Sequence, residues 1–139
     1  MASIRKEIRL ATDPAAVWDV VRDIGAVHTR FAPGFVVDVV MEEGARVVTF
    51  GNGLIAREVI VDVDEAGRRL VYSVRGERLS HHNASFQVFA EGAGSRLVWI
   101  ADLLPASAAG SVEAMMTQGI EAARAALERL NPPEVARPD

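Results

Sequence analysis

The sequence contains no cysteine. This absence excludes disulfide bonds, thiolate nucleophiles, thiolate zinc sites and cysteine-ligated iron–sulfur clusters. The fold therefore has to be stabilised by side-chain packing alone. With 139 residues, half of them apolar, the chain is long enough to bury a hydrophobic core of that kind as one domain.

Long hydrophobic runs and clusters of basic residues are also lacking. No segment is long and apolar enough to cross a bilayer, and the N-terminal stretch MASIRKEIRLA alternates in polarity where a secretory signal would be continuously apolar. Lysine and arginine are scattered and the formal net charge is −4, so the protein would repel a phosphate backbone. We therefore expect a cytoplasmic protein with no integral membrane association and no nucleic-acid partner.

The first part of the chain predicts one strand and two short helices. Residues 3–11 alternate apolar and charged side chains, as in a half-buried strand. Asp13 followed by Pro14 is typical of a helix start, and apolar residues then recur at helical spacing until near Gly25. The stretch that follows, up to Gly34, predicts a second short helix turned across one end of a sheet.

The middle of the chain predicts six further strands joined in consecutive hairpins. Alternating or β-branched segments between Phe35 and Leu104 are separated by short glycine-containing turns, with no helical pattern between them. Together with the first strand, they give about seven antiparallel strands. Pro105 ends the last strand, and from about Ser107 the apolar residues keep a helical period for several turns. The proline-rich residues 132–139 are expected to form a frayed tail.

These elements predict one α+β domain, residues 1–131, in which a curved antiparallel sheet wraps around the long C-terminal helix. The apolar face of such a sheet needs a cover, and only that helix is long enough to supply it. This arrangement is a helix-grip fold. Met115 and Gly119 lie on the helix face that should meet the sheet, where flexible and small side chains could leave a cavity. Alternatively, Gly119 only lets the helix and the sheet approach closely.

Four phrases of the sequence carry a resemblance to a known family. They are DPAAVWDVVRDIG, GLIAREVIVDVDEAGRRLVYSV, HHNAS and LVWIADLLP, and they span nearly the whole chain. The chain resembles the START-like superfamily, also called SRPBCC, and within it the bacterial polyketide cyclase/dehydrase family. The plant abscisic acid receptors look like more distant relatives. The resemblance implies a helix-grip fold with a ligand pocket, but the superfamily includes cyclases, hydrolases, lipid carriers and hormone receptors.

The same resemblance implies pocket positions. Glu58, Tyr72 and either Asn83 or Ser85 fall where such relatives carry residues that face the ligand. The plant receptors have a pocket lysine ahead of their second strand, whereas the matching phrase here, HTRFAP, offers Phe31 near His28. A carboxylate ligand of the kind those receptors bind is therefore not expected.

The residue pattern and the resemblance disagree about Glu58. Val59, Val61 and Val63 form the more apolar face of their strand, which would turn Glu58 outward. A β-bulge after the Gly-Asn-Gly turn would reset the register, and Ile60 shares the face of Glu58. We favour the inward orientation.

Other motifs are better explained by structure than by chemistry. Residues 51–56, GNGLIA, match one form of the dinucleotide fingerprint, but a β-branched run follows instead of a helix, so we interpret the glycines as a hairpin turn and expect no cofactor. His81 and His82 are adjacent on a strand and point to opposite faces, so no metal site is expected, and His82 is placed at the edge of the pocket. Asp102 either caps the end of the sheet or places a carboxylate near the inner rim of the pocket.

Three functions remain open from the sequence. The first is a carrier, sensor or other non-catalytic protein that binds a small hydrophobic or aromatic molecule through Phe31, Met115 and Gly119 as well as the polar residues. The second is a polyketide cyclase or dehydratase, with Glu58, Tyr72 and His82 as catalytic candidates. The third is an interaction module whose pocket is filled by its own side chains. The protein is expected to be a monomer or a homodimer.

Overall fold

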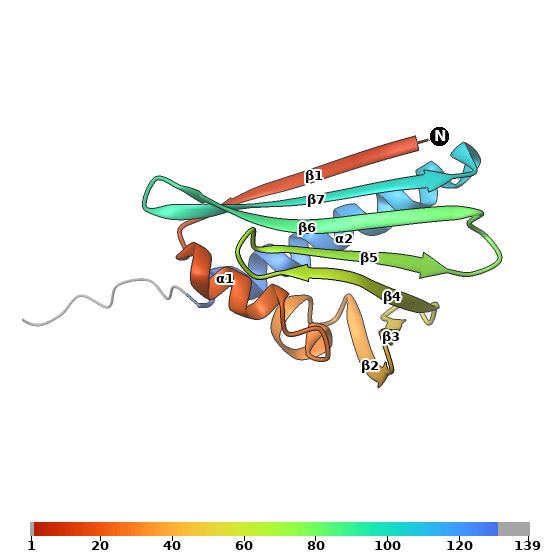
Figure 1. The fold of residues 1–139 in the computed structure, drawn as a ribbon, viewed down its shortest axis with the longest axis horizontal. Coiled ribbons are helices and arrows are strands. Elements are labelled where there is room, and N and C mark those ends of the chain that lie inside the picture. The colour runs from red at the N-terminus through yellow and green to blue at the C-terminus, as the bar shows by residue number, and fades with distance from the viewer. Residues whose placement is uncertain (1, 131–139) are drawn as a thin grey trace, which may run out of the picture.

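The computed structural model describes residues 2–130 and places the elements in the predicted order (Figure 1). They are β1 (Ala2–Leu10), α1 (Pro14–Val21), the π-helical turn η1 (Val27–Phe31), β2 (Val36–Glu42), β3 (Ala45–Phe50), β4 (Ile55–Asp64), β5 (Arg69–Arg75), β6 (His81–Glu91), β7 (Gly94–Leu104), the 3-10 turn η2 (Ala106–Ala108) and α2 (Ala109–Glu128). The predicted helix-grip fold is confirmed. The predicted frayed tail, residues 132–139, lies outside the described residues.

The seven strands form one antiparallel sheet in the order β1-β7-β6-β5-β4-β3-β2. Strands β2 to β7 follow one another through hairpins, and glycines with positive φ make the tight turns, for example Gly44 at φ 69° and Gly92 at φ 56°. Strand β1 pairs with β7, so the beginning of the chain and its last strand lie side by side. The segment containing α1 and η1 then carries the chain from β1 to β2, at the opposite edge of the sheet (Figure 1).

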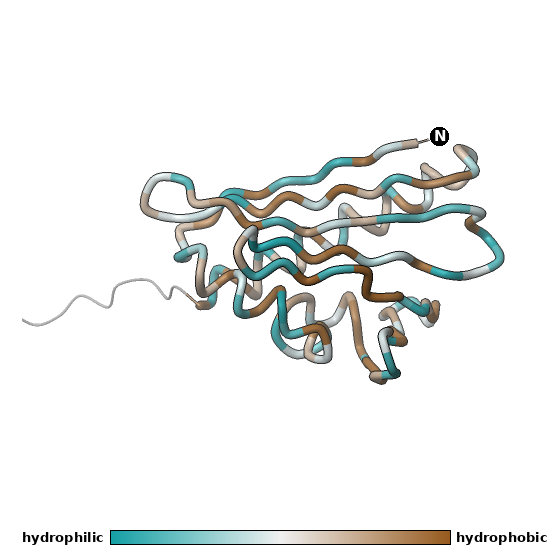
Figure 2. The backbone as a smooth tube through the Cα atoms, viewed as in Figure 1, coloured by the Kyte–Doolittle hydropathy of each residue, from teal (hydrophilic) through white to brown (hydrophobic). Residues whose placement is uncertain are grey.

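The sheet is curved, and its concave face carries the core. Hydropathy alternates along strands such as β1 (Figure 2), as expected for strands with one buried face. The alternate residues of β6 and β7 that belong to the core cluster are Ala84, Phe86, Val88, Leu97, Trp99, Ala101 and Leu103. Helix α2 packs against this face and lies along β1 (Figure 1). Within residues 2–130, no helix is both long and apolar enough to span a bilayer.

Helix α1 closes one end of the sheet. The side chain of Asp13 caps it by accepting hydrogen bonds from the first-turn N–H groups, including that of Ala15 at 3.0 Å. Trp18 Nε1 and Arg22 Nε both donate to Glu65, in the turn between β4 and β5, at 2.8 and 2.9 Å. The helix ends at Val21 instead of near Gly25, because the chain tightens there into a turn that leads to η1.

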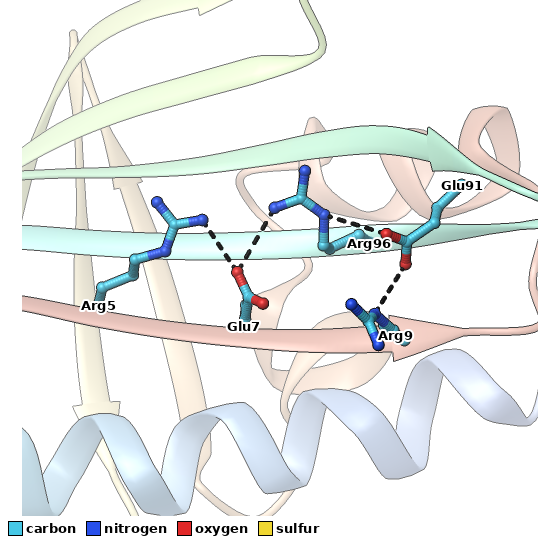
Figure 3. A network of polar contacts seen from close by, with 5 residues as sticks. All are labelled: Arg5, Glu7, Arg9, Glu91 and Arg96. Atoms are coloured by element: carbon cyan, nitrogen blue, oxygen red, sulfur yellow. Dashed lines mark hydrogen bonds and ion pairs between the residues drawn. The ribbon is translucent and has the colours of Figure 1, made fainter.

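The outer face of β1 is covered by charge. Arg5 and Arg96 both contact Glu7, at 2.9 and 3.4 Å, while Arg9 and Arg96 contact Glu91, at 3.0 and 3.6 Å (Figure 3). On β1 these residues alternate with the buried apolar ones. Exposed ion pairs of this kind add little stability, but charged side chains on an edge strand disfavour pairing with another chain.

Gly119 of α2 lies where the helix meets the largest side chain of the sheet. A Cβ atom at this position would lie 2.9 Å from Cε2 of Phe35 and 3.0 Å from Cζ3 of Trp99. Both distances are shorter than ordinary carbon contacts. The glycine therefore allows both aromatic rings to reach the helix backbone, and it also lines the cavity described below. The two alternatives drawn from the sequence are compatible with each other.

We expect Gly119→Ala to destabilise the protein by about 1–3 kcal/mol, because the added methyl group overpacks a buried contact with two aromatic rings. Gly110→Ala is the matched control, since no atom lies within 4 Å of its added Cβ in the same helix. It should stabilise the protein by up to about 1 kcal/mol through helix propensity. Chemical denaturation of both variants tests this, and equal effects on the free energy of unfolding would contradict it.

Candidate functional site

A cavity of about 690 Å³ lies between the concave face of the sheet and α2. Six Phe, Tyr and Trp residues contribute to its wall: Phe31, Phe35, Phe50, Tyr72, Phe86 and Trp99. Apolar residues of β3, β4 and α2 complete most of the lining. The cavity is therefore a mainly apolar chamber of the size that accepts a small organic molecule.

The mouth of the cavity is formed where three connections meet. They are the turn between β3 and β4, the loop between β5 and β6, and the link from β7 into α2. Leu54 and Ile55 at this mouth are 41% and 68% exposed, so the rim itself is partly apolar. These connections lie at the end of the sheet away from α1, which closes the other end (Figure 1).

An ion pair lies inside this apolar chamber. Arg46 Nε donates to Glu58 Oε1 at 2.7 Å, and the two side chains are only 4% and 9% exposed. Arg46 Nη1 also donates to the carbonyl oxygen of Ile24, at 3.2 Å, and its guanidinium lies 5.5 Å from the centre of the Tyr72 ring. The pair is held by its register, because residues 46 and 58 are direct partners on β3 and β4. Both residues line the cavity.

Tyr72 places a neutral hydroxyl next to the ion pair. Its oxygen accepts a hydrogen bond from Trp99 Nε1 at 2.9 Å, and its ring stacks with Phe86, which stacks in turn with Trp99. Burial is the larger cause, and the negative charge of Glu58 the second, that raises the pKa of Tyr72 far above its ordinary value. The phenol therefore stays protonated, and its O–H can donate a hydrogen bond while its oxygen accepts the one from Trp99.

His82 bridges the point where β5 and β6 separate. The regular ladder between these strands ends at the pair Tyr72 and Ala84. Beyond it, the N–H of Val74 donates to His82 Nδ1 at 3.0 Å, and Ser73 Oγ donates to the carbonyl oxygen of His82. Burial lowers the pKa of His82 to about 4, so the ring is neutral near pH 7 with its proton on Nε2.

Six of the predicted site residues line the cavity: Phe31, Glu58, Tyr72, His82, Met115 and Gly119. Glu58 points inward, while Val61 on the same strand is 56% exposed. The bulge that makes this possible is a register shift between Ile60 and Asp62, later in the strand than expected. The binding and catalytic roles of these residues remain predictions.

Four other predicted residues lie away from the cavity, which corrects their expected placement: His28, Asn83, Ser85 and Asp102. On β6 the inward residues are His82, Ala84 and Phe86, so the residues between them point to the opposite face. Asp102 pairs with Asn83 and shares that outer face. His28 lies on η1, where its Nδ1 is buried without a hydrogen-bond partner among the described residues.

Arg46 is one of several cavity residues that the sequence analysis missed, and it is the one in the buried ion pair. Its strand reads ARVVTF, in which Arg46 shares a face with Val48 and Phe50, both of which line the cavity. The sequence does contain a signal for Arg46, because a hairpin turn centred on Asn52 places residues 46 and 58 opposite each other. A charged residue on an apolar strand face, with an opposite charge directly across the hairpin, predicts a buried pair.

The lowered pKa of His82 predicts a pH dependence of stability. The unfolded histidine titrates near 6.5 and the folded one near 4, so the unfolded state binds more protons between these values. Stability should therefore fall as the pH drops through this window, with a contribution from His82 of up to about 1.4 kcal/mol per pH unit. In His82→Asn the Oδ1 atom of the asparagine can still accept the hydrogen bond from the N–H of Val74, but the side chain does not titrate. The loss of stability with falling pH should therefore become shallower.

Denaturation across this pH window measures the effect, with His81→Asn as the matched control because His81 is exposed on the same strand. His81→Asn should keep most of the wild-type slope of unfolding free energy against pH. Identical slopes for the wild type and His82→Asn would show that this residue does not carry the dependence.

Solved structures share this fold at low sequence identity. The protein XoxI of Bacillus cereus superposes with a TM-score of 0.83 at 16% identity, over 95% of this chain and 99% of that one. A protein of Thermobifida fusca has a TM-score of 0.77 at 24% identity, over 99% and 100% of the two chains. The major latex-like protein 151 of Panax ginseng has a TM-score of 0.75 at 16% identity, over 91% and 97%.

These likenesses show the fold and carry no assignment of activity. No curated protein matches the sequence. The family described as polyketide cyclase / dehydrase and lipid transport matches residues 1–131, and the chain belongs to this family.

Proposed function

We propose that the protein binds a small hydrophobic or aromatic molecule in the cavity between the sheet and α2, as a carrier, a sensor or another non-catalytic binding protein. The observation that carries this proposal is the cavity itself, about 690 Å³ in volume, walled by aromatic rings and furnished with a few polar groups. Natural ligand sites combine such apolar walls with a small number of placed polar groups. Members of the family generally bind hydrophobic ligands, which supports the proposal.

The wall supports an aromatic or polycyclic ligand in particular. Phe86 lies between Tyr72 and Trp99, with ring centres 6.0 and 4.6 Å away. Phe31 meets Phe86 edge to face at 5.0 Å. An array of this kind suits a flat guest that packs against the rings lining the cavity, with little loss of side-chain entropy because the rings are already packed.

An interaction module with a filled pocket is a weaker explanation. It would require the protein's own side chains to occupy the space under the sheet. Instead the space stays open, although Met115 and Met116 line it and their flexible side chains could fill it. Keeping such a volume open costs packing energy, which binding of a ligand would recover.

Filling the cavity should abolish binding. Ala56 lines the cavity opposite Val48, and Ala56→Phe would place a ring in the space that the ligand occupies. We expect affinity for the neutral fluorescent probe N-phenyl-1-naphthylamine to fall by at least about tenfold, by loss of accessible volume. Val61→Phe, at an exposed position of the same strand, is the control and should bind as the wild type does.

Equal probe affinity in the wild type and Ala56→Phe would reject the cavity as the binding site. Native mass spectrometry of the purified wild type gives an independent measurement, because a copurified apolar compound should be present there and absent from Ala56→Phe.

A second candidate is a polyketide cyclase or dehydratase that uses the same cavity. The observation that favours it is a buried carboxylate, Glu58, whose Oε2 accepts no hydrogen bond from the described residues. His82 is less suited as a base because Val74 occupies its Nδ1, and Tyr72 is less suited because its pKa is raised.

This candidate predicts that the wild type converts a linear poly-β-ketone to a cyclic product and that Glu58→Gln does not, while the variant still binds the neutral probe. Product analysis by liquid chromatography and mass spectrometry makes the measurement. A wild-type rate equal to that in buffer would reject the enzymatic role.

A further inference from the structure

The ion pair in the cavity is only partly used by the protein. An arginine and a carboxylate often bind through two parallel hydrogen bonds, but here a single bond joins Arg46 Nε and Glu58 Oε1. Arg46 Nη1 is taken by the carbonyl oxygen of Ile24. Among residues 2–130, no protein group hydrogen-bonds Arg46 Nη2 or Glu58 Oε2. Both residues line the cavity and neither of these two atoms is fully buried, so one strong donor and one strong acceptor of the pair remain accessible there.

The net charge of this pair is zero, which restricts the charge of a partner. A ligand carboxylate placed there would lose its hydration and meet Glu58 as well as Arg46, so the desolvation of the ligand would not be compensated. A ligand ammonium group would also lose its hydration, and it would meet the positive charge of Arg46 as well as Glu58. An uncharged group that accepts from Arg46 and donates to Glu58 satisfies both without burying a third charge.

Tyr72 adds a second donor for an uncharged polar group of the ligand. Its ring lies next to the Arg46 guanidinium, and its oxygen already accepts from Trp99 Nε1. Its own proton is therefore available to a ligand acceptor. The polar part of the cavity then offers two donors and one acceptor, a set that matches a carbonyl oxygen next to an N–H or O–H group.

We propose that the Arg46–Glu58 pair is the anchoring subsite for an uncharged polar group that carries an acceptor beside a donor, as in a carboxamide, a lactam or an enolised dicarbonyl. The subsite selects such ligands over carboxylates and over purely apolar molecules of the same shape. This inference rests on the proposed binding function and adds the chemical class of the ligand to it.

Three naphthalenes of nearly equal shape test the inference. They are 2-naphthamide, which is neutral with both groups, 2-naphthoate, which is an anion near neutral pH, and 2-isopropylnaphthalene, which is apolar. Each competes with N-phenyl-1-naphthylamine for the wild-type protein. High salt is used because two exposed arginines, Arg75 and Arg78, also line the cavity, and salt screens their charge. We expect 2-naphthamide to bind at least about tenfold more tightly than either analogue, as two hydrogen bonds in a dry site allow.

A double variant assigns the preference to the pair. Arg46→Met with Glu58→Met removes both charges together, which avoids leaving one buried charge unpaired and generally preserves the fold. It should still bind 2-isopropylnaphthalene and lose its preference for the amide. The matched control is Arg57→Met with Glu42→Met. It removes an ion pair at 3.1 Å that is about half exposed and joins β4 to β2 across β3, and it should leave the preference intact.

A measurement on the unmodified protein makes the test independent of the variant's folding. The Nε–Hε resonance of Arg46 should shift in nitrogen–proton spectra when 2-naphthamide is added and should shift much less with 2-isopropylnaphthalene. No shift with the amide would overturn the inference.

The remaining outcomes separate this inference from the proposed function. Equal binding of all three compounds, tighter binding of 2-naphthoate, or an amide preference that survives in the Arg46 and Glu58 double variant would overturn the inference while leaving the binding function in place. Failure of the wild type to bind the fluorescent probe and all three compounds would overturn both.

Discussion

The structure depends on one geometric constraint, that a single helix has to cover the concave face of seven strands. The outer strands of such a sheet lie roughly 29 Å apart along the hydrogen-bonding direction, whereas a helix with its side chains is about 10 Å wide. Helix α2 lies along β1 and meets β7 at Trp99. The part of the concave face formed by β3, β4 and β5 extends beyond the width of the helix, and three polar residues of the cavity wall, Arg46, Glu58 and Tyr72, lie there.

The buried ion pair follows from this arrangement. Two charges in a fully packed core would cost more desolvation than their attraction returns, and apolar residues would serve stability better. At the wall of an open chamber, the same pair keeps one donor and one acceptor accessible. The hydrogen bonds from Arg46 to Glu58 and to Ile24 also tie β3, β4 and the segment before η1 together around the chamber. In the binding mode proposed above, stability and recognition use different atoms of the same two side chains.

The sequence was sufficient for the elements because their signals are local: alternation within strands, glycine at turns, and an Asp-Pro helix start. It was insufficient for the site because a pocket residue depends on register. The bulge after Ile60 could not be located from the pattern of valines, although the inward orientation of Glu58 was favoured. For β6 the predictions conflicted, since His82 and Asn83 are neighbours on a strand and cannot both face the cavity. The structure places His82 inward.

The protonation states of two cavity residues, Tyr72 and His82, bear on the proposed function. Proton transfer is most effective when a group titrates near the working pH. Here burial moves the pKa of Tyr72 upward and that of His82 down to about 4, so each keeps one state near neutrality. Each is also held in place by a hydrogen bond, from Trp99 and from the backbone of Val74. Groups that keep one protonation state and one direction are suited to orienting a ligand, which supports the binding function proposed above.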